Sequence, residues 1–219
     1  MIELAPEQIL ALAFGTRALR EPYSRLLRLD RSLGRSMPHA SPPIVGQIRL
    51  AWWREQIQSP STANAPDPVL LGLEELIRDR PVSRSDIAGL VDAWEILLVD
   101  SDLTDDNLHD FSKGRGGGVF RLASAIAGVP ADAATERAGM LWALADFSRH
   151  CTDCALADRA LVLARELSGS ARELPRALRP FAILAHFAES DAERGLDQRI
   201  AAGSPRRIAQ AWKFVLGIS

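Results

Sequence analysis

The chain has 219 residues, of which 47% are hydrophobic and 25% are charged, as in an ordinary soluble globular protein. This composition excludes a disordered chain, a collagen-like repeat and a disulfide scaffold. With 26 basic and 28 acidic residues the net charge is −2, which argues against a nucleic-acid partner. The two cysteines favour a reducing compartment. The N-terminal segment is unlike a signal peptide, and no stretch reaches the roughly 18 to 20 apolar residues that cross a bilayer. We therefore expect a cytoplasmic protein, and a peripheral position at an inner membrane is the alternative to test.

Helix-forming residues dominate the chain, because Ala, Leu, Arg and Glu are abundant and strand-like alternation is almost absent. The sequence predicts an all-α fold in a single domain that spans residues 1–219. In chain order we expect helices at 6–37 (one or two, with a break or a new first turn at Pro22), 43–58, 68–79, 85–98, 105–127 and from 131 past Cys154, then helical clusters at 161–167, 178–187 and 208–216. Loops are expected at 38–43, 59–67 and 100–103.

The C-terminal segment 204–219 predicts a capped helix, with Ser204 as N-cap and Pro205 in the first turn. Its apolar residues share one face, which comprises Ile208, Trp212, Val215 and Leu216. The polar complement is basic, namely Arg206, Arg207 and Lys213, and no acidic residue follows Ser204. We favour a helix that closes the bundle with this apolar face. The other interpretation is a peripheral contact with an anionic membrane or an acidic partner.

Two motifs have an ordinary structural interpretation beside a functional one. Cys151-Thr-Asp-Cys154 lies within a predicted helix with no strand before it, so we expect two small residues one turn apart and neither a metal site nor a disulfide. The run from Gly114 to Gly118 interrupts a predicted helix. In one interpretation the glycines allow another helix to approach closely or simply break this one. In the other they leave room for a ligand chain, and the sequence leaves both alternatives open.

Acidic residues cluster near the predicted start of the helix at 105. Asp102, Asp106 and Asp110 are spaced by four residues, as in a helical pair of carboxylates that holds Mg²⁺. We favour the other explanation, which is favourable charge at a helix start, because Asp106 falls in the expected first turn and Asp102 precedes the helix. Asp92 and Glu95 form a second acidic pair at the edge of an apolar face.

The segment 49–54 contains two adjacent tryptophans, Trp52 and Trp53. Neighbouring side chains on a helix point about 100° apart, so both rings can be buried only where the helix has packing partners on two sides. Arg49 precedes Trp53 by four residues, which predicts a cation–π pair. The segment is typical of a central packing helix.

These residues resemble a known family. Gln47-Ile-Arg-Leu-Ala-Trp-Trp-Arg-Glu55 resembles the Arg-Leu-x-Trp-Trp-Arg helix of the squalene/phytoene synthase family. Residues 26–34 resemble the family's helix with the first aspartate-rich motif, and residues 141–155 resemble the helix with the second. Residues 90–95 and 108–120 resemble the middle section of the family, which contains a small-residue helix that lines an isoprenoid tunnel. The resemblance covers roughly residues 10 to 190. It implies an all-α isoprenoid-synthase fold around a central cavity, in which active members use Mg²⁺ to join two prenyl diphosphates head to head.

The chain departs from the family pattern in both aspartate-rich motifs. Asp30 matches the leading aspartate, but Gly34 stands where its partner is expected. Arg149 matches the family's arginine, whereas His150 and Cys154 occupy two aspartate positions. Because few carboxylates remain to hold Mg²⁺, the departures favour a protein that does not catalyse prenyl transfer.

Two functional hypotheses follow from the resemblance. The favoured one is a binding or assembly factor for a membrane respiratory complex, similar to degenerate relatives that assemble complex I, with an isoprenoid or lipid ligand, a membrane-complex protein partner and no metal or other cofactor. The alternative is a Mg²⁺-dependent prenyltransferase to which four residues would contribute: Asp30, Asp102, Asp106 and Arg149. The candidate cavity or ligand-binding residues are Arg49, Trp53, Asp92, Glu95, Gly114, Gly117, Gly118, Arg149 and His150.

Overall fold

The computed structural model describes residues 3–37, 43–59, 67–98 and 102–218, and every regular element in these ranges is helical. The α-helices are α1 (Pro6–Ala13), α2 (Arg17–Arg35), α3 (Pro43–Gln58), α4 (Pro68–Asp79), α5 (Arg84–Glu95), α6 (Asp105–Phe111), α7 (Gly118–Ala127), α8 (Ala133–His150), α9 (Cys154–Glu166), α10 (Arg179–Arg194) and α11 (Pro205–Leu216). The predicted all-α fold is therefore confirmed. Most residues of the loops expected at 38–43, 59–67 and 100–103 lie outside the described residues.

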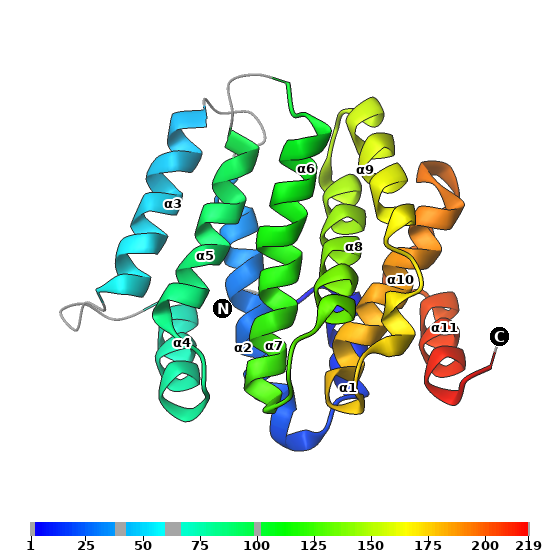
Figure 1. Ribbon diagram of the computed structural model, residues 1–219, viewed down its shortest axis with the longest axis horizontal. Helices are drawn as coiled ribbons and strands as arrows, with labels where there is room; N and C mark the ends of the chain where they lie inside the picture. Colours follow the sequence, from blue (N-terminus) through cyan, green and yellow to red (C-terminus); the bar gives the residue numbers. More distant parts are fainter. Residues whose placement is uncertain (1–2, 38–42, 60–66, 99–101, 219) are drawn as a thin grey trace.

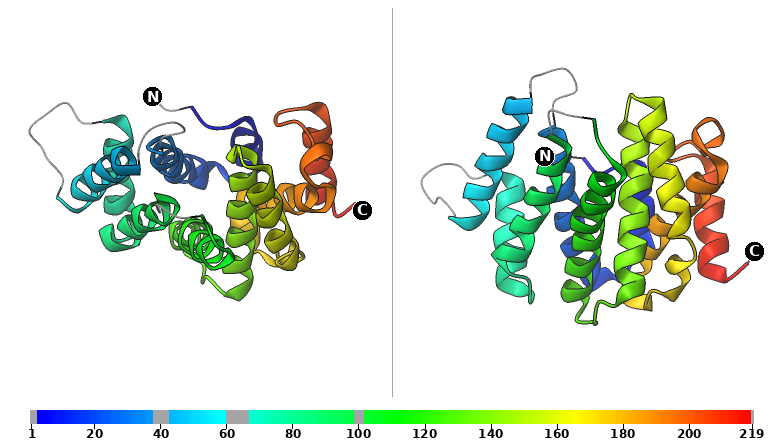
Figure 2. Two further views of the ribbon diagram at one scale, coloured as in Figure 1. Left: turned by 90° about the horizontal axis from the view of Figure 1, so that it is seen from above. Right: turned by 45° about the horizontal axis from the view of Figure 1, so that its top comes forward.

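The helices form two packed layers. In Figure 1, α5, the column formed by α6 and α7, then α8 and α9 lie side by side across the front. Behind them run α2 and α10 (Figure 2). Helix α2 packs on α5 and α7, and helix α10 packs on α8, α9 and α1. α3 lies at one end of the bundle against α5, and α11 lies at the other end against α10 and α1. No helix in the described ranges is both long and apolar enough to cross a membrane.

The first break in the chain differs from the prediction at Pro22. The helices separate at residues 14–16, and Pro22 lies inside α2. A proline cannot donate to the carbonyl four residues earlier, which here belongs to Ala18. Arg80 donates from Nη2 to that oxygen over 3.4 Å and so replaces the missing partner. A long-range contact, which local propensity does not reveal, keeps α2 continuous.

Two further boundaries differ from the predicted ones. The helix expected at 105–127 consists of α6, a π-helical segment η2 (Ser112–Gly117) and α7. The helix expected to run past Cys154 ends at His150, because Asp153 caps a new helix by accepting the backbone N–H groups of Ala155 and Leu156. The cysteine motif therefore lies at the turn between α8 and α9 and not within one helix.

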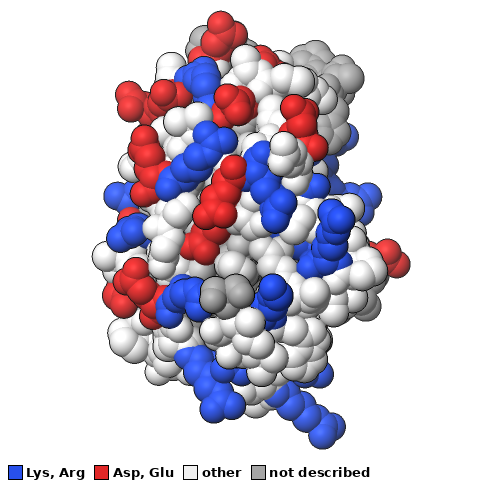
Figure 3. Space-filling model, turned by 90° about the vertical axis from the view of Figure 1, so that its right-hand side faces the viewer, with Lys and Arg blue, Asp and Glu red and all other residues white. Residues whose placement is uncertain are grey.

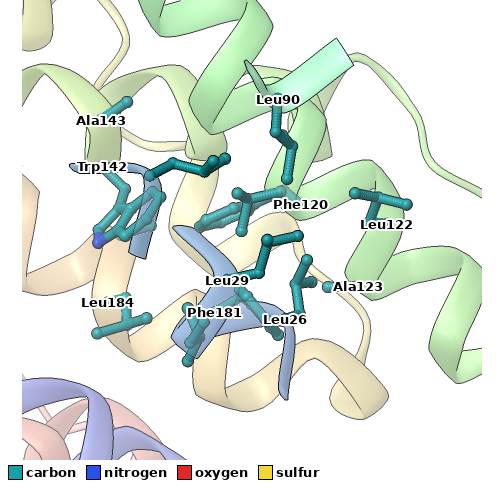
Figure 4. Close-up of a cluster of buried hydrophobic side chains, with 14 of the residues drawn as sticks. Leu26, Leu29, Leu90, Phe120, Leu122, Ala123, Trp142, Ala143, Phe181 and Leu184 are labelled. Carbon is teal, nitrogen blue, oxygen red and sulfur yellow. The ribbon is translucent and has the colours of Figure 1, made fainter. Parts of the chain in front are cut away.

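The apolar core is continuous between the two layers. Its centre joins aromatic rings from α7, α8 and α10 to leucines of α2, and Figure 4 shows Phe120 and Phe181 facing Leu26 and Leu29. The rings of Phe120 and Phe181 lie edge to face with centroids 5.1 Å apart. The packed core holds α2, α5, η2 and α8 in register around the buried polar side chains described below.

The C-terminal helix has the predicted ends but a different buried face. The side chain of Ser204 accepts the backbone N–H of Arg207, as expected of an N-cap. Three of the four residues predicted to be buried are exposed, because Ile208, Trp212 and Leu216 retain 42%, 53% and 63% of their accessible surface. The fourth, Val215, is partly buried against the core. The side that packs carries Arg207, whose ion pairs with α1 and α10 orient the helix. The expectation that α11 closes the bundle with its apolar face is therefore wrong.

Candidate functional site

Asp30 is a charged residue in the middle of the bundle, with no accessible surface. It lies on the buried face of α2, three or four residues from Leu26 and Leu33. Its Oδ1 accepts a hydrogen bond from Nε of Arg115 over 2.9 Å and one from Nε1 of Trp94 over 3.3 Å. Its Oδ2 accepts Nη2 of Arg115 over 2.8 Å. Both oxygens of this carboxylate are therefore bound to the protein itself.

Arg115 is the cation that pairs with Asp30, and its side chain is only 4% exposed. Its guanidinium lies 4.4 Å from the ring centroid of Trp94 and 4.8 Å from that of Trp142. Its Nη2 also donates to Oδ2 of Asp146 on α8 over 2.7 Å. Burial alone would lower the pKa of Arg115, but the two carboxylates outweigh it and raise this pKa. Arg115 thus joins α2, η2 and α8 through one buried charge.

Asp146 is the outer carboxylate of this triad, with 29% of its side chain exposed. Burial tends to raise its pKa, but the charges of Arg115 and His150 hold the pKa below the ordinary value. His150 itself is exposed, and its Nδ1 lies 2.8 Å from the backbone oxygen of Asp146. We call Asp30, Arg115 and Asp146 the central triad. It carries two negative charges and one positive charge.

The glycines around Arg115 are in close contact with neighbouring helices. A Cβ atom at Gly116 would lie 2.0 Å from the backbone oxygen of Gly139 on α8. A Cβ atom at Gly114 would lie 2.7 Å from Cβ of Ala93, and one at Gly118 would lie 2.8 Å from Leu90 on α5. Of the two alternatives that the sequence left open, this geometry is the close approach of helices. The space next to these glycines, and next to Gly117, is occupied by protein atoms.

Gly34 lies one turn after Asp30, under the ring of Trp94. A Cβ atom at Gly34 would lie 3.0 Å from Cη2 and 3.2 Å from Cζ2 of that ring. A carboxylate side chain at this position would therefore have to displace Trp94. The second ligand expected of an aspartate-rich motif is missing, and the place for it is covered.

The residues of the second motif point in different directions. Arg149 donates from Nε to Asp191 on α10 over 3.0 Å and from Nη2 to the backbone oxygen of Ile200. Cys154 is exposed at the start of α9, and Cys151 is partly buried. Burial raises the pKa of the Cys151 thiol, which favours the unreactive protonated form. The expectation that this motif binds no metal and forms no disulfide stays a prediction.

The remaining acidic candidates lie at the surface. Asp102 and Asp106 are exposed at the start of α6, where Thr104 caps the helix. Asp92 and Glu95 on α5 both bind Nη2 of one arginine of α3, Arg54, over 2.6 and 2.8 Å. Within the described residues, no group of three or more His, Cys, Asp or Glu side chains is arranged to hold a metal ion.

The double-tryptophan helix α3 is an end helix, and the prediction of a central packing helix is wrong. Trp53 is 7% exposed and donates from Nε1 to Oγ of Ser36 over 3.2 Å, whereas Trp52 is 44% exposed. Arg49 is exposed, and the cation–π pairs found among the described residues are made by other arginines, so its predicted stacking on Trp53 is not observed. The helix is fixed to α5 by Arg54.

Hollows near these residues are small or open. A cleft of about 220 Å³ lies at the surface between α2 and α4, lined by Arg25, Arg28 and Glu75 among others. A hollow of about 20 Å³ lies between α1, α8 and α10, next to Asp146 and Arg149. The second is about the size of one water molecule. Around Asp30, where the resemblance implies a ligand cavity, Arg115 and the tryptophan rings fill the space.

The sequence was compared with models of known protein families. The model of the squalene/phytoene synthase family matches residues 6–178, which is well over half of the chain. The chain belongs to the squalene/phytoene synthase family. No curated protein matches the sequence. The family consists of transferases that bind prenyl diphosphates, and the match extends from α1 to the turn before α10.

The squalene/phytoene synthase family implies Mg²⁺, and the central triad does not fit that ion. Mg²⁺ requires free oxygen ligands in an octahedral arrangement. Both oxygens of Asp30 and one oxygen of Asp146 already accept hydrogen bonds from Arg115. Gly34 supplies no oxygen, and Asp102 and Asp106 lie on the exposed start of another helix. Among the residues that the structure describes, the observed arrangement therefore forms no magnesium cluster.

Sequence reasoning identified Asp30 but missed its partners. Neither Arg115 nor Asp146 is among the candidate residues predicted from the sequence. The available signal was an arginine flanked by glycines on an otherwise apolar segment, because a charged residue on a buried face requires a partner of opposite charge. Arg54 and Arg207 were likewise not predicted as ion-pair partners.

Proposed function

We propose that this chain is a non-catalytic member of the squalene/phytoene synthase family that works as a binding or assembly factor for a membrane respiratory complex. The observation that carries the proposal is the central triad. Arg115 places a permanent positive charge where a catalytic member would need a divalent cation, and it uses the oxygens that such a cation would bind.

The energetics of the triad support this proposal. Removing Arg115 from Asp30 would leave a carboxylate without water or another cation, at a cost of about 3 to 5 kcal/mol. Mg²⁺ would have to displace the guanidinium and also lose part of its own hydration. A buried ion pair of this kind stabilises the centre of the bundle, and it would have to break each time a catalytic cycle released diphosphate.

The proposed partner is a protein of a membrane complex, and the proposed location is the cytoplasmic side of an inner membrane. Family membership supports an isoprenoid or another lipid as ligand. Similarity to degenerate relatives supports the role in assembly. Arg115 and the rings of Trp94 and Trp142 occupy the centre of the bundle. While Arg115 is paired with Asp30, a ligand chain would therefore lie against the outside of the bundle.

The alternative function is Mg²⁺-dependent prenyl transfer. It is supported by family membership and by Asp30 and Arg149 at matching positions. It would require Arg115 to leave Asp30 when substrate binds. Asp102 and Asp106 would also have to approach the centre from the exposed start of α6.

A turnover assay separates the two functions. The purified protein is incubated with Mg²⁺ and farnesyl or geranylgeranyl diphosphate, and pyrophosphate release is measured beside an active family member. We expect no release above the protein-free rate. Release that disappears in an Asp30→Ala variant shown to be folded by circular dichroism, while an Asp158→Ala control at an exposed carboxylate of α9 keeps it, would establish the enzyme.

A genetic assay tests the assembly role. Deleting the gene in its source organism should lower the amount of assembled respiratory complex without changing the content of squalene-type or phytoene-type products. The opposite pattern, a lost isoprenoid product with a normal respiratory complex, would contradict the proposal.

A further inference from the structure

Helix α11 carries an exposed apolar strip at the end of the bundle. The strip consists of Ile208, Trp212 and Leu216, which are one turn apart, followed by Ile218, which is 51% exposed. Trp212 packs one ring edge on Phe14 of α1 with centroids 4.9 Å apart and still keeps half of its surface. A row of large apolar side chains on a short helix is more than the scattered single residues that are normal at a surface.

Basic side chains border this strip. Arg206 and Lys213 are exposed and lie about 60 to 120° further around the helix than Trp212 and Leu216, at 100° per residue. Figure 3 shows this end of the molecule, where an uncharged lower region is bordered by blue side chains and the red ones gather mainly above it. No acidic residue follows Ser204, in a chain whose net charge is −2.

Buried ion pairs hold the strip in this orientation. Arg207 has no accessible surface, and it donates from Nε to Glu7 of α1 over 2.7 Å and from Nη2 to Asp191 of α10 over 2.5 Å. Its guanidinium also lies 4.8 Å from the ring of Phe187. Because a turn of α11 about its axis would bury Ile208 and Trp212 only by breaking these pairs, the apolar side stays outside.

We infer that α11 binds the surface of a membrane that contains anionic lipids. An exposed apolar strip with tryptophan, flanked by Lys and Arg, is the pattern of a helix that lies in the interface of a bilayer. A second copy of the chain fits less well, because a symmetric contact between two α11 helices would bring Arg206 and Lys213 of each copy close together. The helix lies outside the matched residues 6–178, so the inference is a property of this chain and does not depend on what the central triad does.

Vesicle co-sedimentation tests the inference with the full-length protein. We expect binding to vesicles of phosphatidylcholine with 30% phosphatidylglycerol, and weak binding to phosphatidylcholine alone. The double variant Ile208→Gln/Leu216→Gln should lose binding with an unchanged melting temperature. Arg206→Gln/Lys213→Gln should bind about 30-fold more weakly, roughly fivefold per charge, and be less sensitive to salt.

The matched control uses the opposite end of the bundle. Ile44 and Ile48 on α3 are 55% and 64% exposed, similar to the strip on α11, and Ile44→Gln/Ile48→Gln should bind as the parent protein does. Equal loss of binding in this control would refute the assignment to α11. So would no binding by the parent protein, or a dimer in sedimentation velocity that the α11 variant dissociates.

Discussion

Replacing Arg115 by methionine tests the central triad through stability. The substitution keeps much of the side-chain volume but removes the charge that two carboxylates share. Asp30 has no accessible surface, so water cannot replace its lost partner. Breaking a buried ion pair in this way costs about 3 to 5 kcal/mol, a large part of the roughly 5 to 15 kcal/mol that stabilises a typical domain.

The matched control is Arg54→Met. Arg54 also binds two carboxylates, but its side chain is 30% exposed and those of Asp92 and Glu95 are 64% and 34% exposed. Ion pairs accessible to solvent contribute about 0 to 1 kcal/mol. The same substitution should therefore have a several-fold smaller effect on the free energy of unfolding at this position than at Arg115.

The pH dependence gives the sign of the effect. Because Arg115 helps to hold the pKa of Asp146 below its ordinary value, this pair stabilises the fold above about pH 4 and loses its contribution as pH falls through the lowered pKa. In Arg115→Met, Asp146 lacks this guanidinium, so the variant loses less stability than the parent as acid neutralises this carboxylate. The stability difference between parent and variant should be largest near pH 7 and should shrink toward pH 4 and below.

Urea unfolding followed by circular dichroism at pH 7 and pH 4 provides the measurement. The expected result is a loss of about 3 to 5 kcal/mol at pH 7 that is clearly smaller at pH 4. A loss below about 1 kcal/mol at pH 7, or one that does not change with pH, would show that the triad is not a buried ion pair and would refute this reasoning.

Three further variants test other parts of the account. Gly116→Ala should cost about 1 to 3 kcal/mol or more in urea unfolding, because its Cβ would lie 2.0 Å from a backbone oxygen of α8. Arg207→Met should cost about 3 kcal/mol and raise the protease sensitivity of α11, since it leaves the buried Asp191 with one cation fewer; a stability equal to the parent's would contradict the role given to this pair. Replacing Cys151 and Cys154 by serine should change stability by less than about 0.5 kcal/mol, and elemental analysis of the parent protein should find no stoichiometric zinc.

The helices could be predicted from the sequence where local signals decide them. Ser204 caps α11 as expected, and the double-tryptophan segment forms α3 within the predicted bounds. Errors arose where a distant residue decides. Pro22 stays inside α2 because Arg80 satisfies the freed carbonyl, and nothing near Pro22 in the sequence indicates this.

The candidate site was predicted in part for a similar reason. The sequence identified Asp30 and the substitution at Gly34, which are local departures from a family pattern. It could not identify Arg115 as the partner, because 85 residues separate the two and the pairing depends on how η2 packs on α5 and α8. On α11, periodicity located the apolar residues, but the ion pairs of Arg207 decided which side of the helix is buried.

Metal binding is the most direct test of the claim that Arg115 occupies the place of the catalytic cation. Free Mn²⁺, used in place of Mg²⁺, can be measured by electron paramagnetic resonance with the protein and farnesyl diphosphate present. The account predicts that the parent protein removes no more Mn²⁺ from solution than a folded Asp30→Asn variant does. Two or three Mn²⁺ ions bound per chain, and lost in Asp30→Asn, would contradict it.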